Sequence, residues 1–301
     1  MKTVLITGAN SYIGTSFEEY VLDHYSDELE VSAVDMVDGS CREKDFSSYD
    51  IVFHVAGLAH ADVGHVDDAT RDKYYAVNRD LAIECCTKAK ESGVGQFVFM
   101  SSMIVYGDQT YITETTKPKP ANFYGDSKWQ ADEGVRKLAS EGFTVTVLRP
   151  PMIYGKGSKG NYPKLAKIAK RVPVFPRYNN RRSMLYIENL CEFLVQIMIK
   201  GYGGVYWPQN GEYSSTSDVV RYIAEVHGKR VLFLKALNAM VWIAKRFPVK
   251  KIRDLSGKAC GDSWYEMSMS RYDFEYQRFG LRESVGRAED DGIGLRAFTV
   301  P

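Results

Sequence analysis

The first fourteen residues restrict the fold of this chain more than any other segment. Val4-Leu5-Ile6 is a short apolar run of the kind that forms a buried strand. It is followed by Thr7-Gly-Ala-Asn-Ser-Tyr-Ile-Gly14, and the amphipathic stretch from Thr15 to His24 then predicts a helix. A strand, a glycine turn and a helix in this order point backbone N–H groups at an anion, most often the pyrophosphate of a dinucleotide.

A carboxylate stands at the distance that such a turn requires. The predicted strand at Val31–Val34 ends on Asp35, which is 21 residues after Gly14. A carboxylate about 20 residues beyond the turn accepts hydrogen bonds from the ribose hydroxyls of the dinucleotide. Because Asp35 would repel a 2′-phosphate, NAD is favoured over NADP. NADP stays open, because Arg42 and Lys44 follow in a loop that can reach a phosphate.

The remainder of the first half alternates between the two kinds of element. Strands are predicted at 51–55, 97–100 and 145–148, and helices at 74–91 and 124–140. Short apolar strands separated by helices predict an α/β fold, a Rossmann-type doubly wound parallel sheet. An apolar helix at 188–200 is expected to return to the cofactor domain, and residues 205–207 are expected to add an edge strand to its sheet. We therefore expect a cofactor domain at 1–150 and 183–208, and a smaller C-terminal substrate-binding lobe at 151–182 and 209–301.

Tyr124-Gly-Asp-Ser-Lys128 places a phenol and an ammonium group four residues apart on a predicted helix, so both point from one face. A cation held beside a tyrosine stabilises the phenolate and brings proton transfer within reach of neutral pH. The pattern also occurs by chance, as a packed tyrosine beside a solvated lysine. The motifs that precede it favour the acid–base interpretation.

Several motifs in the correct order resemble those of extended short-chain dehydrogenases/reductases of the NAD-dependent epimerase/dehydratase family. The resemblance runs from Met1 to about residue 230. It rests on Thr7-Gly8 to Gly14, Asp45-Phe46, His54-Val-Ala-Gly57, Val77-Asn78, Ser101-Ser102-Met-Ile-Val-Tyr106-Gly107, Tyr124 and Lys128.

The resemblance implies an NAD site with one departure from the family pattern. The family's turn reads Gly-x-x-Gly-x-x-Gly, and Ser11 stands at its middle position. A Cβ there would crowd a pyrophosphate, although the hydroxyl can donate a hydrogen bond to it, so the change bears on how tightly NAD binds. The implied cofactor residues are Gly8, Asn10, Ser11, Tyr12, Ile13, Gly14, Asp35, Asp45, Phe46, Ala56, Gly57, Asn78, Tyr124, Lys128 and Pro151.

In the family, the C-terminal lobe binds a nucleoside diphosphate sugar. Asn161 resembles the asparagine at the diphosphate, Phe175 the aromatic that stacks on uracil, and Arg182 the arginine that clamps the pyrophosphate. A guanidinium suits that role because its planar fork holds two phosphate oxygens. Phe175 as ordinary core and Arg182 as a solvated side chain remain the alternative. The implied residues for a UDP-sugar are Ser102, Met103, Tyr124, Asn161, Phe175 and Arg182.

The family mechanism assigns a role to each catalytic residue. Tyr124, as phenolate, removes the proton from the sugar O4 while hydride leaves C4 for the nicotinamide. Lys128 holds the tyrosine pKa down and hydrogen-bonds the nicotinamide ribose, and Ser102 orients the reacting oxygen. Return of hydride to the other face of the keto sugar gives 4-epimerisation. The same residues reduce a keto sugar that arrives from another enzyme.

Other features of the sequence distinguish between 4-epimerisation and reduction of a keto sugar. NAD suits a UDP-hexose or UDP-N-acetylhexosamine 4-epimerase, which regenerates its own cofactor, and this is the leading prediction. Residues 148–155, with Met152 where a polar contact is expected, and 180–187 are more similar to UDP-4-keto-6-deoxy-N-acetylhexosamine 4-reductases of surface polysaccharide synthesis. A 4,6-dehydratase is disfavoured, because Met103-Ile104 replaces its Asp-Glu. A non-catalytic dinucleotide sensor would usually lack the tyrosine. The sugar itself stays open.

Composition fits a cytoplasmic enzyme without a nucleic-acid partner. The chain has 39 basic and 38 acidic residues, for a net charge of +1. No apolar stretch is long enough for a signal peptide or stable membrane insertion. The cysteines at 41, 85, 86, 191 and 260 lack metal spacing, so we expect free thiols, mostly buried, and no metal site. A homodimer through 74–91 and 124–140 is expected by analogy with the family.

Two segments of the sequence each have two possible interpretations. The loop Gly155–Gly160 is either a solvated turn or a flap near substrate phosphates. The stretch Ala236–Phe247 is amphipathic and flanked by basic residues, so it either lies on a membrane or packs in the lobe, and packing is favoured. The tail after Ser256 receives no role.

Overall fold

The computed structural model describes residues 1–36, 40–58, 66–239, 242 and 261–290. Its centre is a six-stranded sheet in the order β10-β6-β4-β3-β1-β2, in which every neighbouring pair is parallel. This confirms the predicted Rossmann-type α/β fold. The strands are β1 (Lys2–Thr7), β2 (Leu29–Val34), β3 (Ile51–His54), β4 (Gln96–Met100), β6 (Thr144–Leu148) and β10 (Gly204–Tyr206).

The central strands are apolar at almost every position because both faces of the sheet are covered. Ile51, Val52 and Phe53 of β3 expose 1% of their surface or less. A half-buried strand would alternate between apolar and polar residues, whereas a parallel strand between two helical layers does not. The continuous apolar runs in the sequence therefore predicted the strands correctly.

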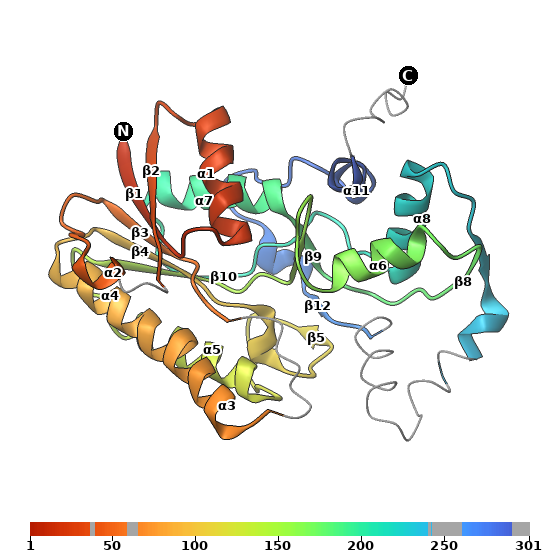
Figure 1. Ribbon diagram of the computed structural model, residues 1–301, viewed down its shortest axis with the longest axis horizontal. Helices are drawn as coiled ribbons and strands as arrows, with labels where there is room; N and C mark the ends of the chain where they lie inside the picture. The colour runs from red at the N-terminus through yellow and green to blue at the C-terminus, as the bar shows by residue number, and fades with distance from the viewer. Residues whose placement is uncertain (37–39, 59–65, 240–241, 243–260, 291–301) are drawn as a thin grey trace.

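Helices cover both faces of the sheet (Figure 1). One layer holds α1 (Tyr12–His24) and α7 (Ile187–Lys200), which pack together. The other layer holds α4 (Leu81–Glu91) and α5 (Phe123–Arg136). The helix α3 (Asp68–Tyr75) leads into α4 through the π-helical turn η1 (Ala76–Asp80), and the short helices α2 (Ser40–Glu43) and η2 (Met103–Tyr106) follow strand ends.

Beyond the sheet, the described part of the C-terminal lobe contains short parallel strand pairs and three α-helices. The pairs are β7 (Met152–Tyr154) with β9 (Met184–Tyr186), β8 (Val174–Pro176) with β11 (Leu232–Leu234), and β5 (Tyr111–Ile112) with β12 (Trp264–Tyr265). The helices are α6 (Asn161–Ala169), α8 (Thr216–Val226) and α11 (Leu281–Glu289), with single turns at η3 (Lys235–Leu237) and η4 (Met267–Ser270).

The element boundaries differ from the sequence predictions at several ends. The helix expected at 74–91 begins at Asp68 and contains the π-helical turn, and the helix expected to reach residue 140 ends at Arg136. The predicted return to the sheet is present, because α7 packs on α1 and β10 pairs with β6 at the edge. The proposed split into two domains stays a prediction.

Some predictions fall partly outside the described residues. Most of the amphipathic stretch at 236–247 and Cys260 lie there. The four other cysteines are buried and free of disulfides. Within the described ranges, no helix is long and apolar enough to cross a membrane, and no group of acidic, cysteine or histidine side chains is arranged to hold a metal ion.

A buried ion pair joins helix α5 to the residue that follows strand β6. Asp132 in α5 is fully buried. Its two carboxylate oxygens accept hydrogen bonds from Nε and Nη2 of Arg149, just after β6, at 2.8 and 2.9 Å. Arg136 Nε at 2.8 Å and the Ser101 hydroxyl at 3.0 Å also donate to it. Four donors satisfy this carboxylate, as a buried charge requires.

We predict that Asp132→Asn lowers the free energy of unfolding by about 3–5 kcal/mol, because the Arg149 guanidinium is left buried without its counter-charge. Urea unfolding measures the loss. The matched control is Asp80→Asn, which breaks the exposed pair between Asp80 and Arg79. An exposed pair contributes below about 1 kcal/mol. Equal losses in the two variants would contradict the prediction.

Candidate active site

The glycine turn after β1 has the geometry of an anion-binding turn. Gly8 and Asn10 adopt φ angles of 122° and 63°. A Cβ built on Gly8 would lie 2.8 Å from the backbone nitrogen of Ala56, so only glycine lets the turn approach the end of β3. The turn thus lies between β1 and β3, where the strand order of the sheet reverses. Open α/β sheets bind their ligands at this point.

Ser11, the residue that departs from the family pattern, caps α1. Its hydroxyl oxygen accepts a hydrogen bond from the Gly14 backbone N–H at 3.1 Å. Tyr12 and Ile13 form the first turn of the helix, and both are half-buried. The Tyr12 hydroxyl is buried and has no hydrogen-bond partner among the described residues, and burial raises the pKa of Tyr12. The serine therefore supports the helix whose N-terminus faces the turn.

The residues expected near the ribose and adenine fall into different environments. Asp35 directly follows β2 and is half-buried. Asp45 accepts hydrogen bonds from the Ser47 backbone N–H at 2.9 Å and its hydroxyl at 2.8 Å, and these bonds lower the pKa of Asp45. Phe46 is fully buried, and the Lys88 ammonium lies 4.7 Å from its ring centroid. The Phe46 ring therefore belongs to the core under the site.

Two elements bring the predicted catalytic residues to the end of β4. Ser102 caps η2 and accepts a hydrogen bond from the Ile104 backbone N–H at 3.3 Å. Tyr124 and Lys128 lie one turn apart on α5. Lys128 Nζ donates to the Met100 carbonyl at 3.1 Å, so the ammonium group reaches the last residue of β4, two positions before Ser102.

The pKa values of this pair correct one prediction. Burial raises the pKa of Tyr124 to about 12, and the neighbouring Tyr74 adds to the rise. Burial lowers the pKa of Lys128 to about 8. We expected Lys128 to hold the pKa of Tyr124 down, but the pKa of Tyr124 is raised. The reason is that both groups are withdrawn from water, which disfavours the phenolate and the ammonium alike.

Asn78 connects the strand ends to the catalytic helix. Its side-chain oxygen accepts from the Leu58 backbone N–H at 2.7 Å, and its amide donates to the Leu58 carbonyl at 3.1 Å and the Ser127 hydroxyl at 3.2 Å. The Ser127 hydroxyl donates to the Tyr124 carbonyl at 2.9 Å. Asn78 lies in the π-helical turn, a distortion often found at functional sites. Its amide is thus occupied by the protein.

The other residues expected at the cofactor line the same edge of the sheet. Ala56 and Gly57 follow β3, and a Cβ on Gly57 would lie 3.0 Å from Lys128 Nζ. Pro151 is buried just after β6. The carbonyl of the preceding Pro150 accepts from the Met103 backbone N–H at 2.9 Å. A side chain at position 57 would therefore push against the catalytic lysine.

The expected substrate residues lie in different parts of the lobe. Asn161 begins α6 and is exposed, whereas Phe175 in β8 is half-buried, with its ring edge-on to Phe233. Arg182 forms backbone bridges to Ser214 and Ser263. The Ser263 hydroxyl is 3.4 Å from Met103 Sδ. Arg182 is therefore joined, through one residue, to the residue beside Ser102.

The tail segment Ser263–Tyr265 has a structural role that the sequence analysis did not predict. Tyr265 is fully buried, its hydroxyl donates to the Arg149 carbonyl at 2.7 Å, and its backbone N–H donates to the Ser183 hydroxyl at 2.9 Å. Its strand, β12, has only two residues. So short a strand has no measurable periodicity, and the aromatic character of the tail was the one available signal.

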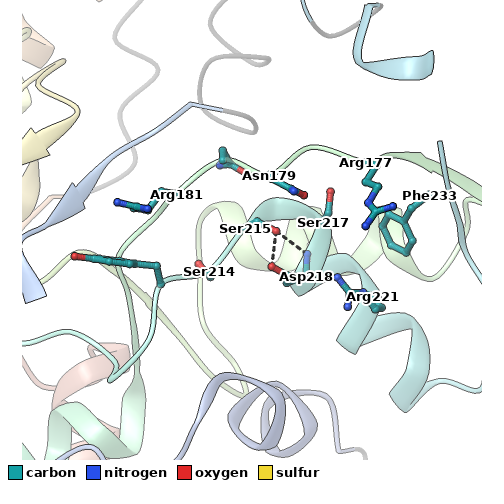
Figure 2. A pocket seen from close by; sticks show the side chains of 11 residues that line it. Arg177, Asn179, Arg181, Ser214, Ser215, Ser217, Asp218, Arg221 and Phe233 are labelled. Carbon is teal, nitrogen blue, oxygen red and sulfur yellow. Dashed lines mark hydrogen bonds and ion pairs between the residues drawn. The ribbon is translucent and has the colours of Figure 1, made fainter. Parts of the chain in front are cut away.

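The lobe also contains a cavity of about 510 Å³ that is rich in arginine. Figure 2 shows Arg177 and Arg221 near one end and Arg181 at the other. Arg181 lies 5.2 Å from the Tyr213 ring centroid, and Arg221 forms an ion pair with Asp218. Three guanidinium groups face one carboxylate, so the cavity suits an anion. The sequence analysis missed it, and Asn161, Phe175 and Arg182 do not line it.

Comparison with known proteins extends this description. A family model described as "NAD dependent epimerase/dehydratase family" matches residues 4–206. UDP-glucose 4-epimerase of Vibrio cholerae is 26% identical over 250 residues, which cover 74% of this chain and 75% of that protein. N-acetyl-alpha-D-glucosaminyl-diphospho-ditrans,octacis-undecaprenol 4-epimerase of Escherichia coli O157:H7 is 29% identical over 210 residues, 64% of this chain and 61% of that protein.

Solved structures share the fold across nearly the whole chain. A dTDP-4-dehydrorhamnose reductase from Clostridium acetobutylicum superposes with a TM-score of 0.72 at 17% identity, covering 95% of this chain and 98% of that one. UDP-glucuronic acid 4-epimerase from Bacillus cereus, in complex with NAD, has a TM-score of 0.70 at 16% identity, with coverage of 95% and 97%.

The family match begins in β1 and ends at the last residue of β10, so it takes in the entire central sheet. The chain belongs to the NAD-dependent epimerase/dehydratase family and is an NAD(P)-dependent enzyme of the extended short-chain dehydrogenase type.

Proposed function

We propose that the protein catalyses NAD-dependent oxidoreduction at C4 of a UDP-sugar, and that the net reaction is 4-epimerisation of a UDP-hexose or UDP-N-acetylhexosamine. One observation carries the proposal: the Tyr124–Lys128 pair stands at the ligand-binding edge of the sheet, and the adjoining lobe holds a cavity with three guanidinium groups. Both curated relatives described above are 4-epimerases by name.

The turn residues fit a dinucleotide. Gly8 leaves room for close approach of a pyrophosphate, the capped N-terminus of α1 offers N–H groups, and Asp35 stands where the ribose hydroxyls would lie. When bound, NAD accepts and returns the hydride at C4. NADP remains compatible with the same turn.

The chain itself handles the proton and the orientation. Tyr124, as phenolate, takes the proton from O4 of the sugar and then, as phenol, gives it back, and the Ser102 hydroxyl donates a hydrogen bond to the same oxygen. The pKa of Lys128 is about 8, so its ammonium group is charged at neutral pH. Its hydrogen bond to the Met100 carbonyl holds it at the end of β4. Burial of the pair keeps bulk water from competing for the proton.

The arginine cavity would hold the diphosphate of the substrate. Arg177 has no carboxylate partner in the described part of the chain, so its guanidinium is available to an anion. Arg181 is stacked between the rings of Tyr213 and Trp264, which orients its donors. Arg182 lies next to it in sequence, so the clamp predicted there and the cavity are adjacent.

A second candidate is reduction of a UDP-4-keto-6-deoxy-N-acetylhexosamine at C4. The observation in its favour is the phenol itself: burial raises the pKa of Tyr124 to about 12, so the side chain is protonated at neutral pH. A protonated phenol is ready to donate to a keto oxygen, whereas the epimerase cycle begins with a phenolate. A non-catalytic sensor is the third candidate, and it leaves the paired Tyr124 and Lys128 unexplained.

Two further predictions belong with the function. The division into a cofactor domain at 1–150 and 183–208 and a substrate lobe at 151–182 and 209–301 would put the reacting sugar between them. A homodimer would form through α4 and α5, which lie side by side.

Denaturation of the purified protein, followed by mass spectrometry of the released nucleotides, separates the first two candidates. We predict near-stoichiometric NAD, because an epimerase keeps its cofactor through the cycle. A protein that releases no nucleotide favours the reductase, which draws on free NADH or NADPH, and the epimerase proposal is then dropped.

We predict that Tyr124→Phe reduces turnover by about 100-fold or more, since a positioned general acid–base contributes roughly 10²–10⁴. The variant should still bind NAD, as measured by calorimetry. Tyr111→Phe, which removes an exposed phenol, is the control and should keep full turnover. If Tyr124→Phe works as well as the control, Tyr124 is not the proton-transfer group.

For the arginine cavity, we predict that Arg177→Ala raises KM for the UDP-sugar roughly tenfold or more, because a charge-assisted hydrogen bond contributes about 1.5–3 kcal/mol. The value of kcat should change little. Arg71→Ala on the exposed surface of α3 controls for loss of a surface charge. An unchanged KM for Arg177→Ala, with a raised KM for Arg182→Ala, would assign the diphosphate to Arg182 instead.

A further inference from the structure

Basic residues are concentrated in two segments of the lobe. Residues 161–177 and 228–239 contain eight Lys or Arg side chains and no Asp or Glu, in a chain whose 39 basic and 38 acidic residues otherwise balance. Only Lys170 among the eight forms an ion pair with another described residue, with Glu289 at 2.8 Å. The eight are Lys164, Lys167, Lys170, Arg171, Arg177, Lys229, Arg230 and Lys235.

The strands β8 and β11 bring the two segments side by side. They pair in parallel, with Val174 opposite Leu232 and Phe175 opposite Phe233. Successive side chains of a strand point to opposite faces. Phe175 and Phe233 pack on the core of the lobe, so Val174, Leu232 and Leu234 point the other way. We call these three residues the outer face of the small sheet.

The outer face of the small sheet is open to solvent. Val174, Leu232 and Leu234 expose 36%, 59% and 37% of their surface. Nine large hydrophobic side chains in the described ranges are exposed, and these three are the ones that adjoin one another across paired strands. Figure 1 shows the pair at the far end of the lobe from the central sheet. Among the described residues, these three side chains are not members of a buried hydrophobic core.

The combination of apolar side chains with surrounding cations identifies the partner. Lys229 and Arg230 lie three and two residues before Leu232, Lys235 follows Leu234, and Arg171 lies three residues before Val174. All four cations are exposed. Exposed apolar side chains ringed by Lys and Arg are the two features that hold proteins on anionic lipid surfaces. A bare nucleic-acid site would not need the leucines, and a homodimer would bring eight like charges against eight.

We propose that the outer face of the small sheet docks the protein on an anionic phospholipid bilayer. The leucines enter the headgroup region while the flanking cations contact lipid phosphates. Phe233, on the opposite face of the sheet, lines the arginine cavity. Membrane docking therefore leaves the cavity free, and the inference does not depend on which reaction the enzyme catalyses.

Co-sedimentation of the full chain with lipid vesicles tests the proposal. We expect binding to vesicles of phosphatidylcholine mixed with phosphatidylglycerol, little binding to phosphatidylcholine alone, and release by salt of about 0.5 M. The double variant Leu232→Glu/Leu234→Glu should reduce the bound fraction at least about tenfold, because it removes the apolar contact and adds repulsion. Urea unfolding verifies that the variant is folded.

Leu22→Glu is the matched control, since Leu22 in α1 exposes 72% of its surface and lies outside the basic segments. It should bind vesicles like the unmodified protein. Equal binding to both kinds of vesicle, or undiminished binding by the double variant, overturns the proposal. It is also overturned if the double variant instead changes the oligomeric state in light scattering, or if duplex DNA but not the vesicles is bound.

Discussion

The buried carboxylate of Asp132 is the interaction on which the active site depends. Asp132 lies one turn after Lys128 on α5, and it binds the hydroxyl of Ser101, the residue before Ser102. It also binds Arg149 at the end of β6. A single charge therefore sets the position of α5, which carries Tyr124 and Lys128, relative to the segment after β4 that carries Ser102. The hydrogen bonds are directional, so the two elements cannot slide past each other without leaving a buried charge unpaired.

The same network reaches the C-terminal lobe. Arg149 donates to the Tyr106 hydroxyl at 2.8 Å, and the Trp207 indole donates to that hydroxyl at the same distance. The carbonyl of Arg149 accepts from Tyr265. Residues of η2 and β12, and the residues that directly follow β6 and β10, thus meet around Arg149 and Tyr106. The lobe that would hold the sugar is in this way attached to the site that would oxidise or reduce it, through satisfied polar groups and not through apolar contact alone.

Burial of Tyr124 and Lys128 also changes the pKa values of both side chains. The environment that holds Tyr124 and Lys128 in place also raises the pKa of the phenol and lowers that of the ammonium. Desolvation disfavours the charged form of each group. Their charge states thus depend on what else enters the site, which connects the direction of proton transfer to ligand binding. The turn capped by Ser11 and the arginine cavity are two places in the described chain that suit a negatively charged ligand.

The sequence by itself determined the parallel sheet, the cofactor turn and the acid–base pair. These features are local: an apolar run, Gly8 before a helix, and two residues one turn apart are each contained in a few neighbouring positions. The structure alone decided the rest. Asp132 and Arg149, Arg177 and Arg221, and Leu232 and Val174 are distant in sequence, and no periodicity links them. Their meeting depends on how helices and short strands pack after the chain has folded, and the charge state of Tyr124 depends on the burial that this packing creates.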